Sequence, residues 1–405
     1  MTVSRIDEMI MRLEGLDSLG REEIEALQLQ KLNSLLSRFK ELPYSFYSEL
    51  PDHLDSISDL CKLQFTTYED LSSHPGSFLI SSQSEVERVL SDATSGTTGA
   101  RKRVFYTAQD IRNTVELFKA GLGELIFEGS RTLICMPFSG PNGLGDLIAK
   151  AIEELGAVPL KIGSYVNYGE LSRVLEHEKP DTFVGFPTNL LSLLRACGKG
   201  SLKRALISAD ACPASVSKAA EEILETPLFP HYGSREMALG GAISCPVHKG
   251  MHLRENHVIA EIIGKNGEVL SPGEYGELVI TTVGMQAMPL IRYRTGDRAV
   301  ILKEPCPCGS KVLRLSTDIT RLSENKAYLA DNELFGFSSV TDCSYKMKGS
   351  DLSVDIIYKD CIDRSAVLSS LSCIFPDCNI SLNLIPFSFS LFPLYRGKRT
   401  VLSEV

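Results

Sequence analysis

The chain contains no tryptophan, and its aromatic content is only 7%. It also lacks an excess of basic residues, because 51 acidic side chains against 42 basic ones leave a net charge of −9. A nucleic-acid-binding protein usually carries a basic face, so this balance speaks against that class. No apolar run approaches the roughly 20 residues that span a membrane, and the N-terminus has no apolar signal core. We expect a cytoplasmic protein that binds neither nucleic acid nor membrane.

The cysteine pattern speaks against a disulfide framework, because 11 cysteines are an odd number spread along 405 residues. Some cysteines nevertheless form a pattern with histidine. Cys245-Pro-Val-His248 is followed, further along the chain, by Cys306-Pro-Cys308-Gly309. Three thiols and one imidazole are a ligand set of closed structural zinc sites, so we predict that Cys245, His248, Cys306 and Cys308 hold Zn²⁺. His252 also follows Cys245 closely and is the alternative fourth ligand.

The hydrophobic pattern predicts an α/β fold. Residues 4–41 have helical periodicity and predict two helices. Between residues 131 and 208, predicted strands alternate with helices, which favours a parallel sheet covered on both faces. Residues 251–302 are rich in strand signals. We predict a large N-terminal domain over residues 1–321, with parallel sheets flanked by helices and a β-rich subdomain, and a small α+β C-terminal domain over residues 322–405.

The most informative motif is Asp92-Ala-Thr-Ser-Gly-Thr-Thr-Gly-Ala-Arg-Lys102, in which hydroxyl residues alternate with glycines before two cations. Glycine lets the backbone approach an anion closely, and consecutive N–H groups can form a nest for phosphate oxygens. The spacing is neither that of a Walker P-loop nor that of a dinucleotide fingerprint. A plain surface loop is the alternative. We predict that phosphate groups bind here, at Ser95, Gly96, Thr97, Thr98 and Gly99, with Lys102 as a charge partner.

Two further motifs follow in the chain. Pro230-His-Tyr-Gly-Ser-Arg-Glu236 offers a carboxylate for Mg²⁺, which would neutralise nucleotide phosphates. Ile291-Arg-Tyr-Arg-Thr-Gly-Asp297 ends in a carboxylate that can accept hydrogen bonds from ribose hydroxyls. Each run alone could be an ordinary turn. Together with the Ser/Thr/Gly run, in this order, they resemble the adenylate-forming, or acyl-CoA synthetase, superfamily.

The resemblance is narrower over residues 25–321, where the chain is similar to the phenylacetate–CoA ligase branch. Leu63-Gln-Phe-Thr-Thr-Tyr-Glu-Asp-Leu71 resembles that branch's Leu-Pro-Phe-Thr-x-Lys-Asp-Leu signature. Ser208-Ala-Asp210 stands where the branch has a Gly-Ala-Glu turn beside the adenine. The resemblance implies Mg²⁺ binding by Glu236 and nucleotide contacts from Ser208, Ala209, Asp210, His231, Tyr232, Gly233, Ser234, Asp297 and Arg321.

The end of the chain carries one more match. Tyr395-Arg-Gly-Lys-Arg399 resembles the superfamily motif with the adenylation lysine. Such a lysine reaches the carboxylate and the α-phosphate and stabilises the charge that develops in the transition state. The resemblance therefore implies a catalytic role for Lys398, together with Glu236 and Thr98. A solvated tail is the alternative for this segment.

The segment before the C-terminal domain departs from the family pattern. The hinge residue is either Ser323 or Glu324, and Leu329-Ala-Asp-Asn332 replaces an Arg-Gly pair that usually follows. In the family this segment moves to build the thioesterification site. The departure leaves the acyl acceptor open among coenzyme A, a carrier-protein thiol and an amine.

The predicted function has two half-reactions. The carboxylate of an organic acid, by resemblance an aromatic one, attacks the α-phosphate of Mg·ATP and gives an acyl-adenylate and pyrophosphate. The acyl group then passes to a thiol, with coenzyme A favoured by resemblance. The alternatives are an adenylating enzyme with another acceptor and a nucleotide-binding protein without catalysis. Expected partners are thus ATP, Mg²⁺, structural Zn²⁺, a carboxylic acid and coenzyme A, and a homodimer is compatible with this prediction.

Overall fold

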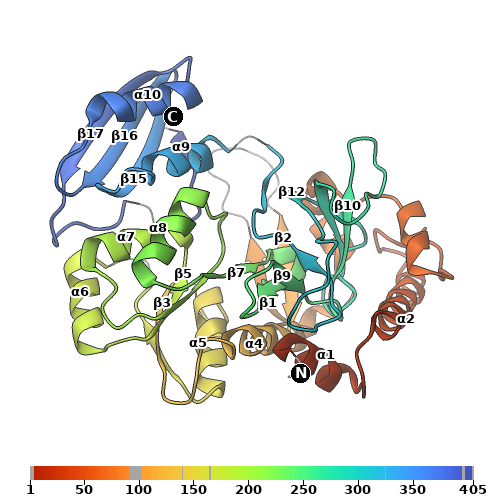
Figure 1. Cartoon of the computed structure of the whole chain (residues 1–405). Helices are drawn as coiled ribbons and strands as arrows, with labels where there is room; N and C mark the ends of the chain where they lie inside the picture. The colour runs from red at the N-terminus through yellow and green to blue at the C-terminus, as the bar shows by residue number, and fades with distance from the viewer. Residues whose placement is uncertain are drawn as a thin grey trace. The chain divides into compact units, whose positions relative to one another are not determined.

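The computed structural model describes residues 4–91, 102–138, 140–163, 166–323, 325–394 and 397–403. The chain divides into two compact units (Figure 1). The first unit consists of Met1–Glu124 and His231–Leu322, and the second of Leu125–Pro230 and Ser323–Val405. The predicted phosphate-binding residues, Ser95 to Gly99, lie outside the described residues, as does Glu324.

The first unit begins with the two predicted helices, α1 (Arg5–Glu14) and α2 (Arg21–Lys40). The Ser4 side chain accepts a hydrogen bond from the main-chain N–H of Asp7 and so caps α1 at its start. Gly15 ends that helix with a φ of 67°, a conformation that glycine adopts without strain. The other helical segments are α3 (Tyr68–Ser73), α4 (Ala108–Leu122) and the 3-10 turns η1 (Ile57–Lys62), η2 (Pro75–Phe78), η3 (Gln83–Glu85) and η4 (Arg235–Met237).

The strands of the first unit form three antiparallel groups. β1 (Val86–Ser91) pairs with β2 (Arg103–Thr107). A four-stranded sheet has the order β10 (Ile259–Ile263), β11 (Gly276–Thr281), β12 (Tyr293–Ala299) and β14 (Thr320–Arg321). The third group contains β13 (Arg314–Leu315), β9 (Met251–Leu253), β8 (Ala242–Ser244) and the end of β7 (Phe229–Tyr232). The β-rich character predicted for residues 251–302 is confirmed.

The second unit contains the predicted parallel sheet. Its strands are β4 (Val158–Lys161), β3 (Arg131–Cys135), β5 (Thr182–Gly185), β6 (Arg204–Ile207) and the start of β7, in this order and all parallel. The helices between them are α5 (Leu144–Glu154), α6 (Tyr168–His177), α7 (Pro187–Cys197) and α8 (Ala214–Leu224) (Figure 1). The alternation of strands and helices predicted from the hydrophobic pattern is confirmed.

The C-terminal part of the second unit is α+β, as predicted. A four-stranded sheet has the order β17 (Asn379–Pro386), β16 (Asp351–Tyr358), β15 (Val340–Lys348) and β18 (Val401–Ser403). Its helices are α9 (Lys326–Leu334) and α10 (Arg364–Ile374). The β15–β16 pair is antiparallel, whereas β17 and β18 run parallel to their neighbours. No described helix is both long and apolar enough to cross a membrane.

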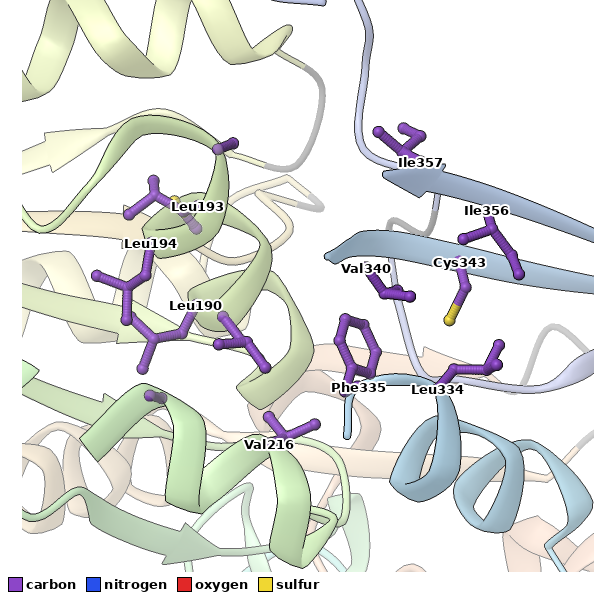
Figure 2. Packing of buried hydrophobic residues seen from close by; sticks show 14 of the residues in the cluster. Leu190, Leu193, Leu194, Val216, Leu334, Phe335, Val340, Cys343, Ile356 and Ile357 are labelled. Atoms are coloured by element: carbon purple, nitrogen blue, oxygen red, sulfur yellow. The ribbon is translucent and has the colours of Figure 1, made fainter. Parts of the chain in front are cut away.

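One hydrophobic core joins the two segments of the second unit (Figure 2). Leu190 and Leu194 of α7 belong to it, and so do Phe335 and Val340 around the start of β15. All four side chains are at most 3% exposed. Residues 323–405 therefore share a core with residues 125–230.

We predict that Phe335→Ala lowers the free energy of unfolding by about 3–5 kcal/mol, because it removes a fully buried ring from this shared core. Urea denaturation followed by circular dichroism measures the change. Phe389→Ala is the matched control, because that ring is 50% exposed. Equal effects of the two substitutions would contradict the role of Phe335 in the core.

Candidate active site

A buried acid–base pair lies where β7 ends. Glu236 is 4% exposed, and its carboxylate forms an ion pair with the ammonium group of Lys102. Burial would raise the pKa of Glu236, but the charge and hydrogen bond of Lys102 outweigh it, and the pKa falls below its usual value. Glu236 is therefore ionised at neutral pH. A buried carboxylate in this form can bind a divalent cation.

The backbone around this pair is tightly constrained. A Cβ atom at Gly233 would lie 2.3 Å from the carbonyl oxygen of Leu239, so only glycine fits there. The hydroxyl of Tyr106 on β2 donates a hydrogen bond of 2.7 Å to the carbonyl oxygen of Arg235. Ser234 and Glu236 are therefore held in place by close packing on one side and by β2 on the other.

A second group of predicted residues meets on the neighbouring sheet. The hydroxyl of Tyr232 donates to Oδ2 of Asp297 at 2.7 Å. β12 and β14 pair so that Asp297 lies opposite Arg321, and the two side chains form an ion pair at 3.1 Å. Arg321 also donates to the carbonyl oxygen of Thr295 at 2.8 Å. The Tyr232 ring, predicted to contact the nucleotide, and the Asp297 carboxylate, predicted to bind the ribose, are thus neighbours.

His231 is buried and packs against an aromatic ring. Its ring lies 5.2 Å from the ring of Phe118 on α4, measured between centroids. Burial lowers the pKa of His231 to about 4, so the imidazole is neutral at physiological pH. Gly240 lies close by, since a Cβ atom there would be 3.5 Å from Nε2 of His231.

In the second unit, the Ser208-Ala209-Asp210 segment follows β6. Ala209 has a φ of 71°, in the left-handed region that side-chain-bearing residues rarely adopt. Asp210 accepts a hydrogen bond of 2.7 Å from the main-chain N–H of Arg399. Burial raises the pKa of Asp210, while that N–H and the charge of Lys398 act in the opposite direction. Lys398 is therefore near the predicted adenine segment, and its side chain is exposed.

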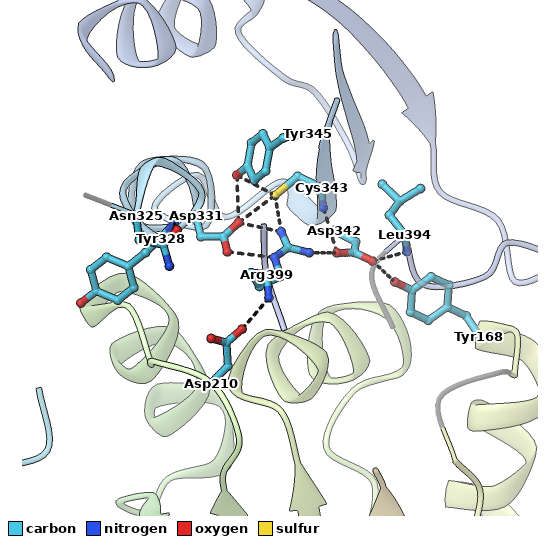
Figure 3. A network of polar contacts seen from close by, with 10 residues as sticks. All are labelled: Tyr168, Asp210, Asn325, Tyr328, Asp331, Asp342, Cys343, Tyr345, Leu394 and Arg399. Atoms are coloured by element: carbon cyan, nitrogen blue, oxygen red, sulfur yellow. Dashed lines mark hydrogen bonds and ion pairs between the residues drawn. The ribbon is translucent and has the colours of Figure 1, made fainter. Parts of the chain in front are cut away.

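A polar network that the sequence motifs did not predict lies next to Lys398 (Figure 3). Arg399 is 5% exposed and Asp331 is 1% exposed. Two nitrogens of the Arg399 guanidinium donate to the two carboxylate oxygens of Asp331, at 2.8 and 2.6 Å. The sequence of α9 does indicate that Asp331 is buried, because this residue falls on the same helical face as the apolar Ala327, Ala330 and Leu334. An acid on an apolar helix face requires a buried cationic partner.

The predicted zinc ligands lie together, with one correction. The potential ligand atoms of Cys245, His252, Cys306 and Cys308 all lie within 4.8 Å of one another. The sulfur atoms of Cys245 and Cys306 are 3.8 Å apart, and the sulfur of Cys308 is 3.5 Å from Nε2 of His252. His248 is not one of the four.

His248 lies in the turn that follows Cys245. It has a φ of 55°, and its N–H donates to the carbonyl oxygen of Cys245 at 2.9 Å. His252 instead lies on β9, which pairs with β8 so that the histidine is opposite Ile243, close to the start of the Cys245 turn. The alternative ligand raised by the sequence is thus the one that the fold brings to the cysteines.

The structure gathers the predicted site residues in two groups. The first unit holds Lys102, His231, Tyr232, Gly233, Ser234, Glu236, Asp297 and Arg321. The second unit holds Ser208, Ala209, Asp210 and Lys398. Thr98 and its neighbours lie outside the described residues.

The Lys102–Glu236 pair predicts a pH-dependent stability. In the wild-type protein the lowered pKa of Glu236 stabilises the fold above pH 4.5, the usual value for this group, and the contribution is lost as pH falls through the folded-state pKa. Lys102→Met removes the largest contribution that opposes the effect of burial on Glu236, so we expect the free energy of unfolding at pH 7 to fall by about 3–5 kcal/mol. The deficit should shrink on acidification, because protonation removes the uncompensated charge.

Urea denaturation at several pH values between 4.5 and 7.5 measures this deficit. The matched control is the double variant Lys102→Met and Glu236→Gln. Its loss of unfolding free energy should not vary with pH over this range, because the glutamine does not titrate. A deficit of Lys102→Met that stays constant over this range would contradict the coupling.

Known proteins resemble this chain in sequence and in fold. A family model described as AMP-binding enzyme matches residues 93–288. A phenylacetate-coenzyme A ligase from Aromatoleum evansii is 30% identical over 345 residues, covering 80% of this chain and 76% of that protein. A ligase of the same name from Thermus thermophilus is 28% identical and covers 76% of this chain and 73% of that protein.

Among solved structures, a 2-hydroxyisobutyryl-CoA ligase has a TM-score of 0.75 with 17% identity, over 95% of this chain and 90% of that chain. This likeness confirms the predicted fold class. The sequence matches confirm the resemblance inferred from the motifs, and the chain belongs to the phenylacetate–coenzyme A ligase family of AMP-binding enzymes.

Proposed function

We propose that this protein activates an aromatic carboxylic acid with ATP and transfers the acyl group to coenzyme A. The acid attacks the α-phosphate of ATP, which forms an acyl-adenylate and releases pyrophosphate. The thiol of coenzyme A then attacks the acyl carbon, and AMP leaves. The relatives named phenylacetate-coenzyme A ligase support both the aromatic acid and the acceptor.

The observation that carries the proposal is the ionised, buried Glu236 at the end of β7. Its carboxylate fits Mg²⁺, because a hard cation prefers an anionic oxygen ligand. Mg²⁺ bound there would offset the negative charge of the ATP phosphates. Lys102, which pairs with Glu236 in this structure, is a further cation available to those phosphates.

Other residues of the chain would orient the nucleotide. Asp297 can accept hydrogen bonds from ribose hydroxyls, and the Tyr232 hydroxyl and Arg321 fix its carboxylate. The Tyr232 ring would stack on the adenine. Lys398 would stabilise the charge that develops on the reacting carboxylate and α-phosphate.

The first unit also supports a structural zinc site. A tetrahedral zinc with Zn–S bonds of about 2.3 Å and Zn–N bonds of about 2.05 Å requires S···S separations near 3.8 Å and S···N separations near 3.6 Å. The observed separations are 3.8 Å between the Cys245 and Cys306 sulfurs and 3.5 Å from Cys308 to His252. Burial lowers the pKa of His252 to about 4, so its imidazole is available as a neutral ligand. We propose that Zn²⁺ joins the end of β8, β9 and the loop before β13.

One experiment distinguishes the proposed acid–CoA ligase from the two alternatives, an adenylating enzyme with another acceptor and a nucleotide-binding protein without catalysis. Pyrophosphate release is measured across a panel of aromatic and aliphatic acids, with and without coenzyme A. An acid–CoA ligase releases pyrophosphate and forms a thioester, whereas an enzyme with another acceptor releases pyrophosphate without thioester. A nucleotide-binding protein without catalysis releases none. The intact Glu236, Asp297 and Lys398 favour the first two outcomes.

We predict that Glu236→Gln slows acid-dependent ATP–pyrophosphate exchange at least tenfold, which corresponds to about 1.4 kcal/mol or more of barrier. The substitution keeps the shape of the side chain and removes the charge. Glu261→Gln is the matched control, because Glu261 is also buried and is paired with Arg292. Wild-type exchange in folded Glu236→Gln would refute the role of this carboxylate.

We predict one tightly bound zinc per chain, which His252→Ala removes and His248→Ala retains. Loss of the metal should lower the melting temperature, because metal binding contributes directly to folding free energy. Elemental analysis of protein purified without chelator gives the metal content. Absence of metal from the wild-type protein would refute the zinc site. Equal metal content in the two variants would contradict the assignment of His252 as the fourth ligand.

A further inference from the structure

Lys398 and Arg399 are consecutive residues with opposite environments. Lys398 is exposed, whereas Arg399 is 5% exposed and lies in the network of Figure 3. Besides its two hydrogen bonds to Asp331, the Arg399 guanidinium lies 3.6 Å from Oδ1 of Asp342. The hydroxyl of Tyr345 donates to Asp331 at 2.8 Å and so supports the same carboxylate. The side chain after the predicted catalytic lysine is thus fixed by two acids of the C-terminal segment.

The geometry of this network favours a role in orientation. A buried ion pair is weak evidence for stability, because apolar residues of similar volume often stabilise a fold as well. A bidentate arginine–carboxylate pair, however, fixes the guanidinium plane through two parallel hydrogen bonds. Here both partners, Asp331 and Asp342, come from α9 and β15, whereas Arg399 precedes β18. The network therefore fixes the backbone of residue 399 relative to the C-terminal sheet.

A second contact fixes the same backbone from the other side. The main-chain N–H of Arg399 donates to Oδ2 of Asp210 at 2.7 Å, and Oδ1 of Asp210 accepts from the N–H of Ala211 at 3.0 Å. Asp210 belongs to the segment predicted to lie beside the adenine. The contact therefore joins the residue next to Lys398 to that segment.

We propose that Arg399 is a positioning residue for Lys398. The Arg399–Asp331 clamp sets the direction of the chain at residue 398, and the hydrogen bond to Asp210 brings the lysine to the nucleotide segment for adenylation. This inference rests on the proposed function. The clamp lies wholly within residues 323–405, so it persists if that segment moves, whereas the bond to Asp210 is made only in the arrangement seen here.

The test is Arg399→Lys, which keeps the positive charge and loses the bidentate geometry. We expect the kcat of ATP–pyrophosphate exchange to fall about 10–100-fold, because small displacements of a catalytic group have effects of this size. The KM for ATP should change less than about threefold, since no contact with ATP is removed. Transfer from a chemically supplied acyl-adenylate to coenzyme A should stay within about twofold of wild type, because Lys398 serves only the first half-reaction. The acid is the one from the panel that gives the fastest exchange.

The matched control is Arg195→Lys in the same unit. Arg195 donates hydrogen bonds to the carbonyl oxygens of Phe335 and Val340, so it also attaches the C-terminal segment, but through the end of α9 and the start of β15. Arg195→Lys should lower the melting temperature. When the rates are corrected for the fraction of folded protein, the ratio of the exchange rate to the transfer rate should stay as in wild type. If Arg399→Lys also leaves the ratio of the exchange rate to the transfer rate as in wild type, the inference is overturned.

Lys398→Ala alone and combined with Arg399→Lys separates the inference from the proposed function. If Arg399 acts through Lys398, Arg399→Lys has no further effect on exchange in the Lys398→Ala background. The same fold-loss in both backgrounds would show a merely structural role. Wild-type exchange in Lys398→Ala would refute the catalytic role of the lysine itself. Loss in Lys398→Ala with wild-type exchange in Arg399→Lys would refute only the positioning role.

A second variant keeps the test decisive if Arg399→Lys does not fold. Asp331→Asn keeps the shape of the side chain and replaces one of the two oxygen acceptors of the Arg399 guanidinium with an amide, and Asp331 is not one of the predicted nucleotide-binding residues. It should lower the kcat of exchange about tenfold or more, and this loss should vanish in the Lys398→Ala background. A loss that persists there would contradict the inference.

Discussion

Burial of carboxylates next to cationic partners is the constraint on which this structure depends. Glu236 has Lys102, Glu261 has Arg292 and Asp331 has Arg399. Each pair joins segments that are far apart in the sequence. Removing one partner would leave an uncompensated buried charge, so each pair fixes a long-range arrangement that apolar contacts alone would leave less specific. Two of the three pairs also lie at predicted catalytic residues or directly beside one.

Local patterns were enough to predict much of the fold. The alternation of strands and helices between residues 131 and 208 was predicted from the hydrophobic pattern, and the two N-terminal helices were visible from periodicity. β15 was not predicted, because Asp342, Cys343 and Ser344 interrupt its apolar pattern although all three are buried. The buried Asp342 has partners in distant segments, namely Tyr168, Leu394 and Arg399. No local pattern contains that information.

The candidate site likewise contains residues that local motifs predict and residues whose role depends on distant parts of the chain. Tyr232, Glu236 and Asp297 were predicted because family motifs mark them, and the structure gives them partners that suit those roles. The fourth zinc ligand was chosen as His248 on spacing alone, whereas the strand pairing of β8 and β9 brings His252 to the cysteines. Arg399 carried no motif of its own. Its partner Asp331 was detectable only as a charge on an apolar helix face.

The short strand β14 fixes the chain as far as Leu322, whose N–H donates to the carbonyl oxygen of Gly296 at 2.9 Å. Arg321 is therefore held opposite Asp297 by the first unit's own sheet. Insertions, deletions or substitutions in the segment that begins at Ser323 can therefore leave the Asp297–Arg321 ion pair in place. The boundary between β14 and α9 is thus a position at which the chain can vary in length during evolution while the sheet that holds Asp297 is retained.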